Sequence, residues 1–188
     1  MDKLLRKRYL YALVLAVLLV VLLTIIFRPS NSAKAEVKDP YNITGIKPCE
    51  LLSQKEAKEI LEEETTVGIP GDSTNSIGMV TCKYSVNDAN LPARFIQLTI
   101  VQDSNITEEQ KKTGLTSKSI YDNAKKLATK SKSGIVIMDK DKYEAFYSDK
   151  MLVLYKNNVK LNIAISGKNR DDAQKYESKA LSLIAPRL

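Results

Sequence analysis

One stretch of this 188-residue chain limits its architecture more than any other: residues 9–27 carry no charge and are almost entirely apolar. As a helix, at ~1.5 Å per residue, they would extend roughly 28 Å, about the thickness of the hydrocarbon core of a bilayer. Lys3, Arg6, Lys7 and Arg8 directly precede them. Because positive charge is retained on the cytoplasmic side, we expect residues 1–8 in the cytoplasm, a single span of the plasma membrane over 9–27, and an extracytoplasmic remainder.

A cleaved secretory signal is the alternative. Ala33, Lys34 and Ala35 form an A-x-A site, and cleavage near Ala35 would secrete the remainder of the chain. The apolar stretch is longer than the roughly 7 to 15 residues of a typical signal, and Arg28 and Pro29 separate it from the A-x-A site. A retained anchor, a linker over 28–46 and one domain over 47–188 therefore suit the pattern better. That domain is long enough to bury a single core.

Composition argues against several classes of function. The net charge of +7 lies partly in the N-terminal basic cluster, and the remainder is too weakly basic to indicate nucleic-acid binding. The chain has no histidine, which removes Ser-His-Asp and Cys-His catalytic arrangements and His-ligated zinc. We therefore predict no catalytic residues, no metal site and no cofactor, and we expect a protein that is not an enzyme.

Two short motifs resemble catalytic ones only superficially. Ser166, Gly167 and Lys168 lack the upstream glycine of a phosphate-binding loop, so a strand-to-helix turn is expected there. Ser148 stands two residues from Lys150, but that segment is typical of a hairpin turn, whereas a Ser-Lys pair needs a desolvated lysine.

The charged runs and the sequons each allow both a structural and a functional interpretation. Glu62, Glu63 and Glu64 are interpreted as a solvated helix end, with cation binding as the alternative. A basic stretch is interpreted as a solvated helix face, with anionic lipid or wall polymer as the alternative partner; it comprises Lys125, Lys126, Lys130 and Lys132. Asn42 and Asn105 begin N-x-T sequons, which the sequence leaves open as glycosylation sites.

The two cysteines, Cys49 and Cys82, both lie beyond the expected membrane span, where an oxidising compartment allows them to pair. We predict one disulfide, which would close a loop of about 34 residues and stabilise the fold by roughly 3 to 4 kcal/mol. The alternative is a reactive thiol, but that needs a basic partner or a C-x-x-C spacing.

Periodicity and capping signals predict the elements of the domain. A capping box of Ser53 and Glu56 starts a helix that extends to about Glu63. Residues 68–78 are expected to form a loop, followed by two alternating strands near 80–86 and 93–102. A short helix capped by Thr107 precedes a second helix with Ile120, Ala124, Leu127 and Ala128 on its apolar face.

The C-terminal part is predicted to be mostly β-structure. Short strands are expected at 135–138, 143–147 and 151–155, and Asn157 with Asn158 forms a two-residue turn into a strand over 159–165. Asp171 or Asn169 caps a final helix. Hairpin-joined strands with helices between blocks indicate an α+β fold, in which helices cover an antiparallel sheet.

The segment Pro48 to Ser53 with Glu56 and Ala57, followed later by Cys82 and Tyr84, resembles the PCxLLtxxEA…CxY signature of a domain of unknown function found in actinobacterial secreted lipoproteins. Glu144 with Ala145, and the turn and strand that follow over 157–166, are similar to a second block of that family. The resemblance implies an LpqN-like or PsbP-like sandwich with the cysteines bridged. In place of the family's lipid-modified cysteine, this chain has a plain apolar segment.

The expected function is that of an extracytoplasmic, non-catalytic interaction module of the cell envelope, anchored in the membrane. Its partner would be an unknown envelope protein or lipid. The alternative is a module that binds a small apolar or lipid ligand in a cleft between sheet and helices.

Overall fold

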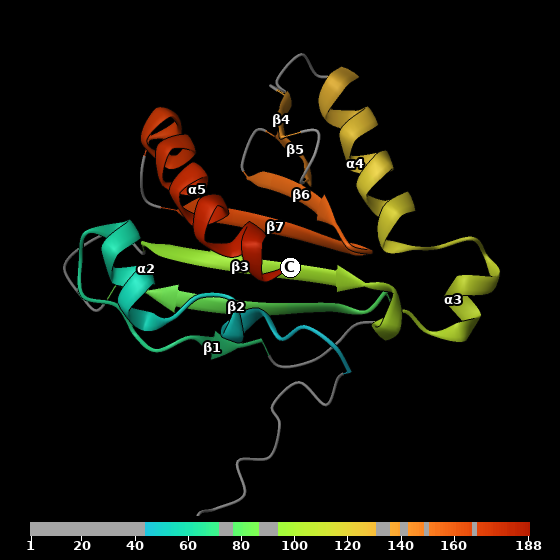
Figure 1. The fold of residues 1–188 in the computed structure, drawn as a ribbon, viewed down its shortest axis with the longest axis horizontal. Helices are drawn as coiled ribbons and strands as arrows, with labels where there is room; N and C mark the ends of the chain where they lie inside the picture. The colour runs from blue at the N-terminus through green and yellow to red at the C-terminus, as the bar shows by residue number, and fades with distance from the viewer. Residues whose placement is uncertain are drawn as a thin grey trace, which may run out of the picture. The chain divides into compact units, whose positions relative to one another are not determined.

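A computed structural model describes residues 44–71, 77–86, 94–130, 136–139, 143–148, 151–166 and 169–188, and seven strands within these ranges form one antiparallel sheet (Figure 1). The strand order is β1-β2-β3-β7-β6-β5-β4. The strands are β1 (Ile69–Pro70), β2 (Met79–Ser85), β3 (Phe95–Gln102), β4 (Val136–Asp139), β5 (Tyr143–Tyr147), β6 (Leu152–Lys156) and β7 (Val159–Ser166). The α+β class with an antiparallel sheet is confirmed.

Two meanders meet at the centre of this sheet. Strands β1 to β3 form the first and β4 to β7 the second, and β3 pairs with β7 over their full lengths, from Phe95 opposite Ser166 to Gln102 opposite Val159. Asn157 and Asn158 both have positive φ, 49° and 60°, as the predicted tight turn between β6 and β7 requires. The register of β7 against β3 therefore fixes which side chains of the two meanders share a face.

The helices are α2 (Gln54–Leu61), α3 (Glu108–Lys112), α4 (Ser117–Lys130) and α5 (Arg170–Ile184), with 3₁₀ turns η1 (Pro48–Glu50), η2 (Asp103–Asn105) and η3 (Ala185–Arg187). The capping predictions are confirmed. Ser53 and Glu56 form a complete capping box, and the Thr107 hydroxyl accepts from the Gln110 N–H. Of the two candidates for the last helix, Asn169 is the N-cap, and its Oδ1 accepts from the Asp172 N–H at 2.9 Å.

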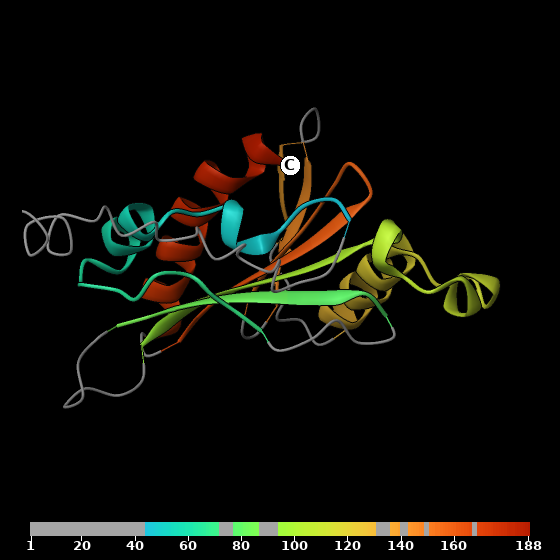
Figure 2. The same ribbon diagram turned by 90° about the horizontal axis from the view of Figure 1, so that it is seen from below.

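One face of the sheet is apolar and lies against η1, α2 and α5, which share one side of β2 and β3 in Figure 2. Its strand residues follow the predicted alternation, including Val80, Cys82 and Tyr84 on β2 and Ile96, Leu98 and Ile100 on β3. The helices are also joined to each other: Tyr176 Oη donates to a Glu62 oxygen at 2.9 Å, and Lys179 Nζ donates to the Glu59 carbonyl at 2.7 Å. This side forms the main core.

On the opposite face, α4 covers β5, β6 and the start of β7. Tyr121 is fully buried and lies 5.4 Å from both Phe146 and Tyr155, measured between ring centroids. The prediction that Leu127 belongs to the apolar face of this helix is wrong, because Leu127 is 68% exposed. A stripe of Ser117, Tyr121, Ala124 and Ala128 faces the sheet instead, since these positions recur at three and four residues.

The predicted loop over 68–78 is partly wrong, because its first residues form the edge strand β1, with Ile69 opposite Lys83. Two residues give no periodicity from which a strand can be predicted. Gly68 allows this close approach: a Cβ there would lie 2.8 Å from both Cys82 Sγ and Tyr84 Cζ.

Cys49 and Cys82 form a disulfide that links η1 to β2, with their Cα atoms 5.2 Å apart. The predicted pairing is therefore present. The Tyr84 hydroxyl also bonds to the Leu52 carbonyl, so the segment before α2 is fixed to β2 by both a covalent and a polar contact.

Residues 1–43, and with them the predicted cytoplasmic segment, membrane span and most of the linker, lie outside the described residues. Among the helices that are described, none combines the length and the hydropathy needed to cross a bilayer. All described residues belong to one compact unit, Asp39–Leu188.

Candidate functional site

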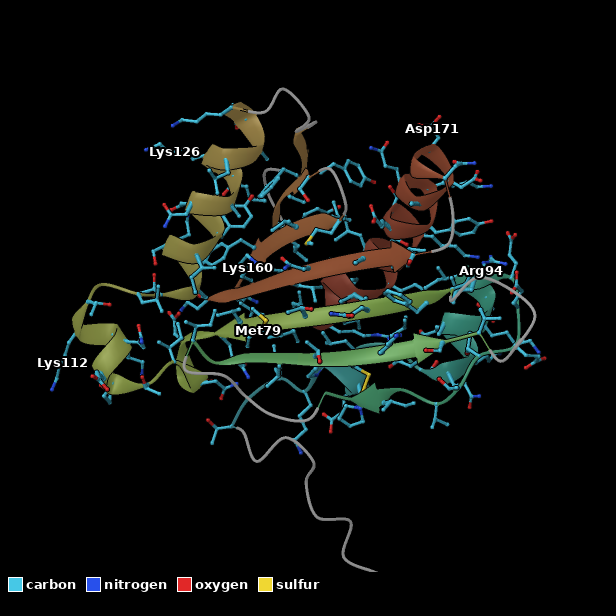
Figure 3. All side chains as sticks on the ribbon, turned by 180° about the vertical axis from the view of Figure 1, so that it is seen from behind. Met79, Arg94, Lys112, Lys126, Lys160 and Asp171 are labelled. Carbon is cyan, nitrogen blue, oxygen red and sulfur yellow. A yellow bond between two sulfur atoms is a disulfide. The ribbon has the colours of Figure 1, made fainter. Side chains whose placement is uncertain are left out.

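The face of β2, β3 and β7 that points away from α2 and α5 has polar side chains along its middle, with Met79, Phe95, Val101 and Ala164 between them and at its ends. We call it the polar face and define it by Thr81, Lys83, Gln97, Thr99, Lys160 and Asn162. Strand alternation places these side chains opposite the core residues, and the register aligns Thr81, Thr99 and Asn162 in one row across the three strands. Helix α4 packs against the first residues of β7, where the Ser117 hydroxyl donates to the Asn158 carbonyl at 2.8 Å, and in Figure 3, which views this side, β2 and the far end of β3 lie beyond this helix.

Lys160 is the least expected residue of this face, because it is only 6% exposed. Its neighbours in register are Val101 on β3 and Tyr155 on β6, so apolar groups flank its stem. The ammonium reaches along the strand and donates to Asn162 Oδ1 at 2.7 Å. Among the described residues no carboxylate pairs with it, and burial lowers the pKa of Lys160 to about 8.

The rest of the polar face is more open. Thr81, Gln97 and Asn162 are partly exposed and Lys83 is exposed, whereas Thr99, the neighbour of Asn162 on β3, is buried. Lys83 Nζ lies 4.2 Å from the centroid of the Phe95 ring, a cation–π contact at the far end of the face. The strand residues on this side include two lysines and no Asp or Glu. The face therefore offers hydrogen bonds and positive charge.

The predicted basic stretch lies on α4, apart from Lys132, which is outside the described residues. Lys125 forms an ion pair with Glu144 on β5, so its charge is already compensated. Lys126 and Lys130 are exposed and border a shallow hollow with Asp122, Lys125 and Thr129. Both ammonium groups lie on the outer face of the helix without an ion pair to any residue in the described ranges, as expected for a solvated surface.

The acidic run after α2 does not gather around a common point. Arg94 forms an ion pair with Glu63, Lys58 forms one with Glu64, and Tyr176 donates to Glu62. Within the described ranges no three His, Cys, Asp or Glu side chains are placed to hold a metal ion.

Of the remaining sequence motifs, the described residues form turns and strand ends and include no pair of reactive groups in contact. Ser148 Oγ donates to the Met151 carbonyl at 3.1 Å, as in a hairpin turn, and Lys150 is outside the described residues. Ser166 ends β7, and Gly167 and Lys168 are not described. Asn42 also lies outside the described residues, whereas Asn105 Nδ2 is enclosed and has no hydrogen-bond partner in the described part of the chain. A glycan could therefore not be attached to Asn105 in this folded state.

Sequence reasoning missed Lys160 because alternation along a strand shows only which side of the sheet a residue faces. It does not show whether the residue is buried on that side. A signal was present, however. Once β2, β3 and β7 are placed side by side, their outward positions contain Lys83 and Lys160 with no acidic residue to balance them.

Comparison of the chain with protein-family models, with curated proteins and with solved structures finds no match, so the resemblance to the actinobacterial lipoprotein domain stays a prediction.

Proposed function

We propose that this protein is a non-catalytic binding module of the cell envelope, held at the outer side of the plasma membrane by one N-terminal helix, and that it contacts its partner through the polar face. The observation that carries the proposal is Lys160, a buried lysine at the end of the polar face where α4 reaches β7, whose ammonium bonds to the neutral Asn162 amide and pairs with no carboxylate among the described residues. Keeping a charge there costs stability, and such a cost is typical of a functional position.

The alternative was a small apolar ligand bound between the sheet and the helices. On that side the described residues pack against one another: Ile60, Leu98 and Ala180 are all 0% exposed. Packing of this density favours the polar face over an apolar cleft as the binding surface.

Site-specific photo-crosslinking in the host cells tests the proposal. Benzoylphenylalanine is placed in the full-length protein at Lys83 or Gln97 on the polar face, and, as matched controls, at Asp171 or Lys175, which are exposed on α5. We expect light-dependent adducts from positions 83 and 97 and none from 171 and 175. Equal adducts from both pairs, or adducts from the α5 pair alone, would show that the polar face is not the contact surface.

A further inference from the structure

We propose that Lys160 and Asn162 form a binding site for a carboxylate group, so that the ligand or partner of the polar face presents a carboxylate to it. This inference rests on the proposed function, because it uses the same face, and it adds the chemical class of the group that is bound.

The Lys160 ammonium has hydrogen-bonding capacity left over. A lysine ammonium has three N–H donors, and one of them bonds to Asn162 Oδ1 at 2.7 Å. The remaining positive charge is desolvated, because the side chain is 6% exposed and lies between Val101 and Tyr155. A buried ammonium with no anion nearby is unfavourable, and an anionic ligand group would remove that cost.

The neighbouring groups supply the other contacts that a carboxylate needs. Because Asn162 Oδ1 accepts from the ammonium and no described residue accepts from its NH₂ group, that group can donate to a second oxygen, and Asn162 is partly exposed. Thr99 and Thr81 follow in the same row on β3 and β2, and each has a hydroxyl. Two ligand oxygens can thus be bound by one charged and one neutral donor, with hydroxyls beside them.

The charge count favours a carboxylate over a phosphate. A phosphate carries up to about two negative charges and is usually bound by several cationic groups. The strand residues of this face contain only one further lysine, Lys83, which is exposed and lies over the Phe95 ring. The single positive charge of the buried Lys160 ammonium therefore matches the single negative charge of a carboxylate.

The experiment is an NMR titration of the full chain in detergent, labelled at lysine, in which the Lys160 side-chain signal is assigned with Lys160→Met. Acetate is the probe, acetamide is its neutral isostere, and inorganic phosphate is the third arm, all at constant ionic strength. We expect a saturable shift of the Lys160 signal with acetate, an apparent Kd at least tenfold lower than for phosphate, and no saturable shift with acetamide. The exposed Lys126 on α4 is the internal control and should show no saturable response.

Asn162→Asp is the second variant, because it supplies a carboxylate from the protein itself. It should raise the pKa of Lys160 and abolish the response to acetate, and this result does not depend on whether Lys160→Met folds. Equal responses to acetate and acetamide, no response of Lys160, or tighter binding of phosphate would each overturn the inference. If one of these results is found but positions 83 and 97 still give cross-links, the proposed function stands and only the proposed ligand class is wrong.

Discussion

Lys160 shows at the scale of a single residue how a binding position can lower stability. Its pKa falls from 10.5 to about 8 in the folded chain because the amine is buried. Between these two values the unfolded chain binds more protons than the folded one, so the contribution of Lys160 to stability rises with pH over that interval. Below about pH 8 both states are protonated, and the folded state carries the full cost of the buried charge.

We therefore predict that Lys160→Met stabilises the protein at pH 7 by about 1 to 3 kcal/mol. Methionine keeps an unbranched apolar stem but has no charge. The magnitude follows from about 1.4 kcal/mol for each unit by which the pKa is shifted. The gain should shrink between pH 8 and 10.5. Urea unfolding at pH 7 and pH 10 measures it, with the exposed Lys126→Met as the control. A loss of stability at pH 7 would mean that the ammonium has a stabilising partner in the folded chain.

Glu56 gives the opposite pH dependence. Hydrogen bonds from the Arg187 side chain, followed by those from Ser53, lower the pKa of Glu56 from 4.5 to about 2. This carboxylate therefore stabilises the fold above pH 4.5, and its contribution is lost as the pH falls towards 2. The pair joins α2 to the C-terminal turn η3.

Glu56→Gln should cost about 1 kcal/mol at pH 7, less than the full shift implies, because Arg187 is 40% exposed and solvent screens the pair. The difference from the wild type should close as the pH is lowered from 4.5 to 2. Thermal unfolding across this range measures it. Glu59→Gln, an exposed position on the same helix, is the control, and a matching loss there would assign the effect to the net charge of α2.

At the scale of elements, the disulfide joins the first turn η1 to β2 across 33 residues of sequence. Cys82 is 0% exposed in the core, whereas Cys49 is partly exposed in η1, so the bridge ties a surface turn to the core. We predict that replacing Cys49 and Cys82 together by alanine lowers the free energy of unfolding by roughly 3 to 4 kcal/mol. Denaturant unfolding of the oxidised and reduced wild type provides the control, and equal stability of all three forms would contradict this prediction.

Most elements could be predicted from the sequence where local chemistry determines them. The capping box at Ser53, the alternation around Leu98 and the Asn157–Asn158 turn each act through neighbours a few residues away, and all three predictions are confirmed. The failures concern tertiary contacts. Strand β1 exists because β2 lies beside it, and Leu127 is exposed because the sheet takes the Tyr121 side of α4. The burial of Lys160 likewise depends on β3 and α4, which pack beside β7 but are distant from it in sequence.

At the scale of the whole molecule, one sheet separates two kinds of surface. The pairing of β3 with β7 joins the two meanders so that one side of the whole sheet forms the main core, whereas the other side is apolar under α4 at β5 and β6 and carries the polar face on β2, β3 and β7. The start of the described chain is also fixed to this sheet. The buried Gln102 side chain donates to the carbonyls of Thr44 and Ile46 at 3.0 and 3.2 Å and accepts from the Ile46 N–H at 3.0 Å. The contacts of the domain therefore begin before residue 47, within the segment predicted to be a linker.

The last prediction concerns the placement of this domain in the cell. The basic cluster before the apolar stretch over 9–27 predicts that the domain is outside the plasma membrane and tethered to it, and a structural disulfide is typical of the oxidising conditions of such a compartment. Protease added to intact cells from which any outer barrier has been removed should degrade the domain, whereas a cytoplasmic marker protein should survive. A domain that survives together with the marker would place it inside the cell and contradict the topology. A soluble product that begins at Glu36 would instead show cleavage after Ala35, leaving the polar face in a secreted protein.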